Sequence, residues 1–193
     1  MQHLSEQEVL RREKREKLMA MGIEPYPASS FEISHLAEPV KQDFDEQADP
    51  PQQVSMAGRL MTRRISGAAS FAELQDSSGR IQLYFRRDDL CPGENKDLYN
   101  TVFKKLLDIG DVIGIKGFLF KTKVGEVTVH VQSLTVLTKS LRPLPVVKEV
   151  KDEEGNVKTY DTFSDPETRY RQRYVDLVVN PQVRDVFVQR SEL

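Results

Sequence analysis

Hydrophobic and polar residues alternate along several segments in the middle of the chain. Alternation with a period of two is typical of strands that bury one face. The segments are residues 54–64, 69–76, 79–88, 111–121 and 126–138. Between the third and the fourth, residues 95–107 carry apolar side chains at helical spacing, and we expect Asn95 to cap this helix and Gly110 to end it. The order of three strands, a helix and two strands predicts a mainly β fold, the five-stranded OB-fold barrel.

The N-terminal residues predict another helix. Over residues 5–21, Ser5 and Glu8 have the spacing of a capping box, and Gly22 is the expected end. Residues 11–17 contain five basic and two acidic side chains, beside a thin apolar stripe. The pattern favours a solvated helix held by its own ion pairs. The alternative is a helix that contacts an RNA backbone.

Other signals appear on both sides of the predicted barrel. Residues 37–53 are acidic, contain proline and show no periodicity, which indicates a boundary or covering segment. After the barrel, residues 146–151 and 157–160 flank DEEGN and predict a hairpin. Asp165-Pro166 and Asn180-Pro181 each predict the start of a helix, and the chain reaches Leu193 within a helical pattern, as expected of a truncated domain. The expected parts are an N-terminal helix with a covering segment (1–53), the barrel (54–140), a linker (141–164) and the start of a second domain (165–193).

The alternation also predicts which side chains face solvent. If the apolar positions of residues 80–86 face the core, Gln82 and Tyr84 face outward. The same phase in residues 69–76 turns Phe71 outward. In the last strand the valines at 127, 129 and 131 are expected to point inward, and the outward set is Glu126, Thr128, His130 and Gln132.

Turn lengths bring several outward side chains together. A short turn after the second strand places Phe71 opposite Tyr84 and diagonal to Gln82. A two-residue loop before that strand, with glycine first, places Arg64 opposite Phe71. A ring, a guanidinium, an amide and a phenol therefore gather on one face, as a surface that stacks on unpaired bases and reads their edges would require.

Two interpretations of this patch remain open. In one, Phe71 stacks on a nucleobase; in the other, a loop or residues 37–53 cover the ring. The first strand also loses its alternation, so Arg64 reaches this face only if the strand contains a bulge, which we expect at Gly58.

Composition limits the remaining possibilities. The net charge is −2, but residues 54–140 hold 13 basic and 9 acidic side chains, a net of +4 for the barrel. The single cysteine, Cys91, allows no internal disulfide, and the sequence has no secretory signal or membrane-length apolar run, which together indicate a cytoplasmic protein. The three histidines lack metal-ligand spacing, and no catalytic constellation is evident. We therefore expect no metal, cofactor or catalytic residue in this chain.

Four sequence blocks resemble the anticodon-binding portion of the bacterial class II lysyl-tRNA synthetases. They are residues 54–90 (VSMAGRLMTRRISGAASFAELQDSSGRIQLYFRRDDL), 117–126 (GFLFKTKVGE), 137–145 (LTKSLRPLP) and 169–180 (RYRQRYVDLVVN). The last two are similar to the lysyl branch, whereas aspartyl- and asparaginyl-tRNA synthetases share only the architecture.

The resemblance implies roles for four residues. Phe71 matches the ring that stacks on the middle anticodon base, a uridine in lysine tRNAs. Gln82 and Arg64 match the side chains that hydrogen-bond this base, and Glu126 matches an acidic residue that contacts a neighbouring anticodon base.

The resemblance also implies the context of the full-length protein. It would be a homodimeric lysine–tRNA ligase whose α/β catalytic domain uses ATP and Mg²⁺, and its signature motifs would follow Leu193, so we expect this chain to be inactive and its oligomeric state to be undecided. The alternatives are a free-standing OB module for single-stranded nucleic acid, a member of the aspartyl or asparaginyl branch, and a protein-interaction domain.

Overall fold

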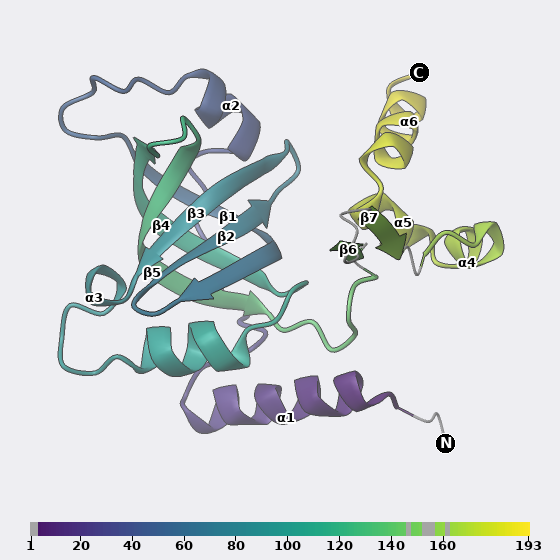
Figure 1. Ribbon diagram of the computed structural model, residues 1–193, viewed down its shortest axis with the longest axis horizontal. Coiled ribbons are helices and arrows are strands. Elements are labelled where there is room, and N and C mark those ends of the chain that lie inside the picture. Colours follow the sequence, from purple (N-terminus) through teal and green to yellow (C-terminus); the bar gives the residue numbers. More distant parts are fainter. Residues whose placement is uncertain (1–3, 146–147, 152–156, 161–162) are drawn as a thin grey trace. The chain divides into compact units, whose positions relative to one another are not determined.

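The computed structural model describes residues 4–145, 148–151, 157–160 and 163–193 (Figure 1). The chain divides into two compact units, Met1–Pro143 and Leu144–Leu193, and each is described by itself. None of the described helices is long and apolar enough to cross a membrane.

The first unit is built on a closed barrel with the strand order β1-β2-β3-β5-β4 (Figure 1). All pairs of neighbouring strands are antiparallel except β3 and β5, which are parallel. The strands are β1 (Gln53–Ser66), β2 (Ala69–Gln75), β3 (Arg80–Arg86), β4 (Val112–Lys121) and β5 (Val127–Thr138). This arrangement confirms the predicted order of three strands, a helix and two strands.

The helix between β3 and β4 differs from its predicted form. It is the π-helix η1 (Leu98–Leu106), preceded by the short helix α3 (Arg87–Leu90). The prediction of Asn95 as its cap is wrong, because the Asn95 side chain accepts a hydrogen bond from the amide of Asp97, outside the helix. The predicted end is also wrong: the helix stops at Leu106, before the turn that contains Gly110.

One face of η1 closes the barrel. Its buried side chains are Tyr99, Val102, Phe103 and Leu106. Phe103 stacks on Phe85 of β3 with 4.1 Å between ring centroids, and the Tyr99 hydroxyl lies 2.7 Å from that of buried Ser70 in β2. Because a buried phenol needs a hydrogen-bond partner, this pair fixes the helix against the strands without leaving a polar atom unsatisfied.

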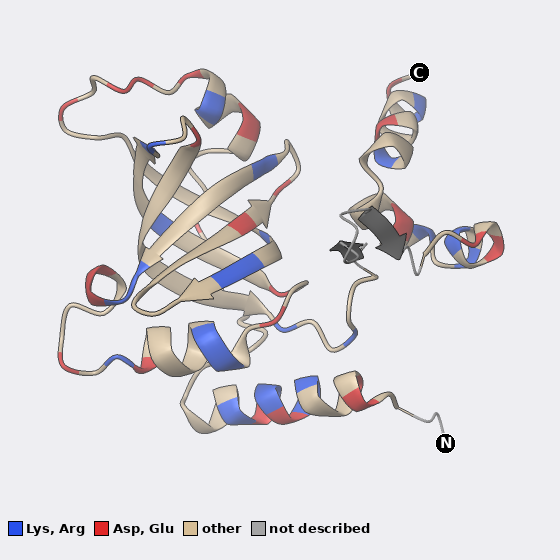
Figure 2. Ribbon diagram, in the orientation of Figure 1, with Lys and Arg blue, Asp and Glu red and all other residues tan. Residues whose placement is uncertain are grey.

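The N-terminal helix α1 (Glu6–Ala20) lies beside η1 (Figure 1) and has the predicted capping box at Ser5 and Glu8. Both signs of charge run along it (Figure 2). Its favoured interpretation as a solvated helix held by its own ion pairs is only partly correct. Most of its side chains are exposed, but Leu18 is fully buried in the core and Arg11 is also buried. Arg11 donates to the backbone oxygens of Ile109 and Ser140, at 3.0 and 3.1 Å, so this guanidinium attaches the helix to the barrel.

A buried ion cluster supports the same junction. The Nζ atom of Lys139, fully buried, lies 2.6 Å from Asp108 and 2.7 Å from Asp111, and Lys14 of α1 reaches Asp108 at 2.5 Å. Burial raises the pKa of Asp111, although Lys139 opposes this shift. Burial acts in the same direction on Asp108, but hydrogen bonds and charges from Lys139 and Lys14 outweigh it and hold its pKa below the ordinary value. The cluster therefore ties α1 to the start of β4 and the end of β5.

Residues 37–53, predicted to lack periodic structure, begin with the six-residue helix α2 (Ala37–Gln42). Ala37 and Val40 are buried in the core, and the Ala37 amide donates to Asp76 Oδ2 at 2.6 Å. Asp76 also accepts bonds from Ser78 and Gly79 through Oδ1, so one side chain closes the β2–β3 turn and holds α2. Residues 37–53 therefore cover part of the barrel, which is one of the two roles predicted for them.

The described residues of the second unit form a hairpin and three helices. The predicted hairpin is confirmed by the antiparallel pairing of β6 (Lys148–Lys151) with β7 (Val157–Tyr160). The helices are α4 (Pro166–Arg171), α5 (Arg173–Val179) and α6 (Pro181–Glu192). Asp165 caps α4 as predicted; Asn180 precedes α6 but bonds back to Asp176 without capping the next helix.

We expect Arg11→Ala to destabilise the first unit by about 1–3 kcal/mol, since it removes a charged donor from the backbone oxygens of the half-buried residues Ile109 and Ser140. Urea unfolding followed by circular dichroism measures the loss, and hydrogen exchange shows whether α1 opens first. The matched control is Lys17→Ala, an exposed cation on the same helix, which should change stability by less than about 0.5 kcal/mol. Equal effects of the two substitutions would contradict the docking role of Arg11.

Candidate nucleic-acid interface

The outer face of the barrel carries two rows of side chains in register across all five strands. The first row runs Arg64, Phe71, Tyr84, His130 and Phe118. The second runs Thr62, Glu73, Gln82, Thr128 and Phe120. The predicted pairings of Phe71 with Tyr84 and of Arg64 with Phe71 are thus confirmed.

A pocket of about 560 Å³ opens over these rows. Its lining comes from β1, β2, β3, β4 and the turn that follows β4: Arg64, Phe71, Gln82, Tyr84, Phe120, Lys121, Thr122, Lys123 and Val124. Three of the four residues singled out from the sequence therefore lie together, and the Phe71 ring is half-buried rather than covered.

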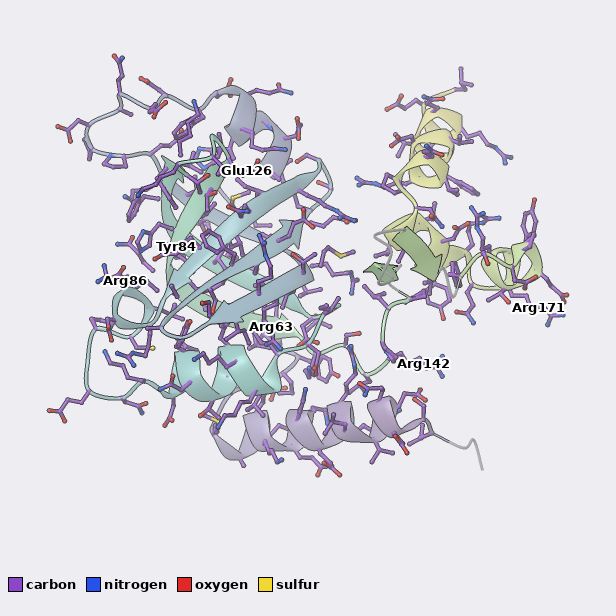
Figure 3. All side chains as sticks on the ribbon, viewed as in Figure 1. Arg63, Tyr84, Arg86, Glu126, Arg142 and Arg171 are labelled. Atoms are coloured by element: carbon purple, nitrogen blue, oxygen red, sulfur yellow. The ribbon has the colours of Figure 1, made fainter. Side chains whose placement is uncertain are left out.

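Arg64 reaches the pocket through a bulge, but not where we expected it. Gly58 pairs regularly with Ile113, and the register of β1 against β2 shifts between Leu60 and Thr62 instead. The extra residue restores the outward phase for Arg64. The neighbouring Arg63 (Figure 3) points the other way and donates to the backbone oxygen of Phe103, so it attaches β1 to η1.

Tyr84 of β3 (Figure 3) is at the centre of a connected group of rings. Phe71 packs against Tyr84 at 5.1 Å and a tilt of 48°, and Phe120 meets Tyr84 edge-on at 5.8 Å. His130 also meets Tyr84 edge-on, at 5.2 Å, and stacks on Phe118 at 4.7 Å. These contacts hold Phe71 and Phe120 in place on two sides of the pocket, so an aromatic guest meets rings that are already ordered.

The polar groups of the pocket are mainly hydrogen-bond donors. Among the described residues, Arg64 and Lys123 have no ion-pair partner, and no acidic side chain lines the pocket. Lys121 pairs with Glu46 at 3.2 Å. Glu73, the acidic neighbour in the second row, is held by Arg80 at 3.2 Å. The site therefore presents positive charge and exposed rings together, as binding of a nucleic-acid strand requires.

Sequence reasoning placed Thr128 among the outward, solvent-facing residues, and this is wrong in one respect. The side chain lies on the outer face but is completely buried. Its neighbours in the row are Gln82 and Phe120, and its hydroxyl donates to Gln82 Oε1 at 3.0 Å. Thr128 therefore forms the floor of the pocket between Gln82 and Phe120, which line it.

The turn after β4 was missed as part of the site. Thr122 and Glu126 close it through the Thr122 N–H to the Glu126 backbone oxygen at 2.9 Å, and Gly125 takes a φ of 90°. The sequence signal was available in KTKVG, two cations and an exposed valine at a glycine turn. Nothing in the alternation pattern predicts that this turn folds over the patch.

Comparison with known proteins bears on the first unit directly. Residues 54–137 match the family model described as the OB-fold nucleic acid binding domain. The match covers the same strands that close the barrel. The family match and the strand order together show that residues 54–137 have the OB-fold.

The whole chain is similar to parts of longer proteins. It is 56% identical over 189 residues to the lysine–tRNA ligase of Porphyromonas gingivalis, covering 97% of this chain and 32% of that protein. It is 57% identical over 193 residues to the lysine–tRNA ligase of Christiangramia forsetii, covering 100% and 32%. The corresponding enzyme of Azobacteroides pseudotrichonymphae is 55% identical over 190 residues, covering 98% and 37%. The chain thus spans about a third of the length of these relatives.

Within the OB-fold domain, Glu126 stands apart from the other three predicted residues. It precedes β5 beside the turn (Figure 3), is exposed, and does not line the pocket. Its contact with a neighbouring base stays a prediction.

Of the remaining sequence candidates, His3 lies outside the described residues, and the others serve the structure of the first unit. His130 bonds Asp89 at 2.8 Å, His35 bonds Ser34 and Gln52, and Cys91 is buried. No cluster of potential metal ligands occurs among the residues that the structure describes.

Proposed function

We propose that the pocket binds a base of a tRNA anticodon, and that the chain is the tRNA-recognition part of a lysine–tRNA ligase. One observation carries the proposal: ordered rings and unpaired donors share one pocket on an OB-fold domain whose relatives are lysine–tRNA ligases. Stacking supplies affinity for any base, and donors at the base edge supply identity.

The proposed binding mode assigns a role to each side chain. Phe71 stacks on the middle base of the anticodon, with Tyr84 supporting its ring from below. Gln82 and Arg64 donate hydrogen bonds to the edge of that base, a uridine in lysine tRNAs. Glu126 contacts a neighbouring base as the loop passes the turn after β4. Lys121 and Lys123 lie where phosphates of the loop would pass.

We infer the rest of the enzyme from the same likeness. In a full-length protein of this kind, an α/β catalytic domain would activate lysine with ATP and Mg²⁺ and transfer it to lysine tRNA. The protein would act in the cytoplasm as a homodimer. Residues 165–193 would be the beginning of that catalytic domain, after a linker over residues 141–164.

Two alternatives remain distinct from this proposal. A free-standing module for single-stranded nucleic acid would bind lysine and unrelated anticodon loops equally. The tRNAs of an aspartyl or asparaginyl enzyme would also have a middle uridine in the anticodon. The preference for the flanking anticodon bases would therefore distinguish the three branches. Stem-loops with lysine, asparagine, aspartate and unrelated anticodons therefore decide between the proposals in one titration.

Phe71→Ala should weaken binding of a lysine anticodon stem-loop by about 1–3 kcal/mol, since stacking on an aromatic side chain has this value per base. The loss should be similar when the middle uridine is replaced, because any base can stack. Titration of four stem-loops that differ only at the middle base measures both quantities. Phe118→Ala is a matched control in the same row, outside the pocket lining. Wild-type binding by Phe71→Ala would show that this ring is structural.

Gln82→Ala and Arg64→Ala should reduce the difference in affinity between the cognate stem-loop and the three others. They remove hydrogen bonds to a base edge, so the cognate loop should lose about 1 kcal/mol or more and the other loops less. The same titration gives the ratio of affinities for the uridine loop and the cytidine loop. An equal loss for all four loops would mean that these side chains position the RNA backbone.

Binding should also weaken as salt rises. Arg64, Lys121 and Lys123 line the pocket, and each phosphate contact contributes a slope of about −0.7 in a plot of log affinity against log salt concentration for a single strand. Lys123→Ala should reduce the steepness by one such contact, whereas Lys17→Ala on α1 should not. A slope near zero for the wild-type chain would contradict backbone contact at this face.

A further inference from the structure

The floor of the pocket contains a hydroxyl that fixes the orientation of an amide. Thr128 is completely buried between Gln82 of β3 and Phe120 of β4. Its Oγ1 atom lies 3.0 Å from Gln82 Oε1 and 3.2 Å from the backbone oxygen of Glu126. Both neighbours are acceptors and the hydroxyl has a single proton, so we assign this proton to the nearer acceptor, the amide oxygen of Gln82.

This bond decides which end of the amide enters the pocket. A primary amide has an oxygen that accepts and an NH₂ group that donates, and rotation by half a turn exchanges them. With Oε1 held by Thr128 at the floor, the NH₂ group of Gln82 is the end available to a guest. Among the described residues, the Gln82 side chain has no other hydrogen-bond partner, and the competing acceptor for the Thr128 proton, the Glu126 backbone oxygen, lies farther away at 3.2 Å.

A fixed NH₂ group changes which bases the pocket accepts. Uracil presents a carbonyl oxygen where cytosine presents an amino group, and the other pyrimidine carbonyl is common to both. The Gln82 NH₂ group therefore complements the distinguishing oxygen of uracil, and two donors face each other when cytosine is bound. A side chain free to rotate would offer its oxygen to cytosine and lose this discrimination.

We propose that Thr128 is a positioning residue that gives the pocket its selectivity for a carbonyl edge by locking the Gln82 amide. The inference rests on the proposed function, because it concerns how the same pocket reads the middle anticodon base. Thr128 touches no base itself; it acts through Gln82.

The test uses the chain with three substitutions and two stem-loops, one with uridine and one with cytidine at the middle anticodon position. Thr128→Val has nearly the same shape and lacks the hydroxyl, whereas Thr128→Ser keeps it. We expect Thr128→Val to lower the ratio of uridine to cytidine affinity by about 3- to 10-fold, the range of one hydrogen bond. Much of this change should come from stronger binding of the cytidine loop. Thr128→Ser should retain the wild-type ratio.

A double-mutant cycle separates the proposal from a general structural effect. In a Gln82→Ala background, Thr128→Val should leave the ratio unchanged, because no amide remains to be oriented. Thermal unfolding of each variant identifies those that are folded, and a damaged barrel would weaken both loops equally. Equal weakening by Thr128→Val in a chain that retains Gln82 would overturn the proposal.

The outcomes distinguish this inference from the function on which it rests. A wild-type chain that binds the two loops equally contradicts the proposed reading of the middle base, and this inference with it. A wild-type chain whose discrimination depends on Gln82 but survives Thr128→Val contradicts only the positioning role.

Discussion

The register between β1, β2 and β3 determines what the outer face of the barrel presents. A slip of one residue in either pairing would move Phe71 or Gln82 to the opposite face of its strand. Asp76 closes the β2–β3 turn with bonds to the amides of Ser78 and Gly79, and this sets Phe71 against Tyr84. Gly67, with a φ of 55°, allows the two-residue loop that sets Arg64 against Phe71. The pocket therefore depends on two short turns more than on any contact within it.

The other half of the pocket depends on how closely β4 approaches β5. A Cβ atom on Gly117 would lie 2.0 Å from the backbone oxygen of His130, so the strands pack this closely only because residue 117 is a glycine. This approach brings Phe118 onto the His130 ring and aligns Phe120 with Thr128. Farther along the same pair, Lys139 joins the end of β5 to Asp111 at the start of β4. The close approach at Gly117 and the buried Lys139–Asp111 pair thus fix β4, which contributes Phe120 and the turn after β4 to the pocket.

Much of this face could be predicted because it depends on local pattern. Alternation identified the strands, and turn lengths placed Phe71, Tyr84 and Arg64 together. The bulge was expected because β1 loses its phase, but its position between Leu60 and Thr62 follows from packing against β2 and not from a glycine. Asn95 was a poor guide to the next helix because a residue with a good capping side chain can equally bond within the preceding loop.

Tertiary contacts could not be predicted in the same way. Thr128 can be predicted to be buried only if β3 and β5 are known to be parallel neighbours. Gln82 of β3 and Thr128 of β5 are 46 residues apart in the sequence, so no local pattern indicates this pairing. The same limit applies to the turn after β4, whose place over the patch depends on barrel closure. Arg11 is the clearest case, because its carbonyl partners include Ile109 and Ser140, which no helical pattern could indicate.

Basic residues counted along the sequence therefore do not locate the surface proposed to bind RNA. Residues 11–17 have the densest run of cations that the sequence analysis singled out, yet Arg11 binds backbone oxygens and Lys14 binds Asp108. The cations of the pocket are fewer, but Arg64 and Lys123 have no ion-pair partner among the described residues. A cation already paired gains little from a phosphate, since it must first give up its partner, whereas an unpaired cation beside an exposed ring gains the full interaction. The availability of the charge, set by the fold, thus matters more than its density in the sequence.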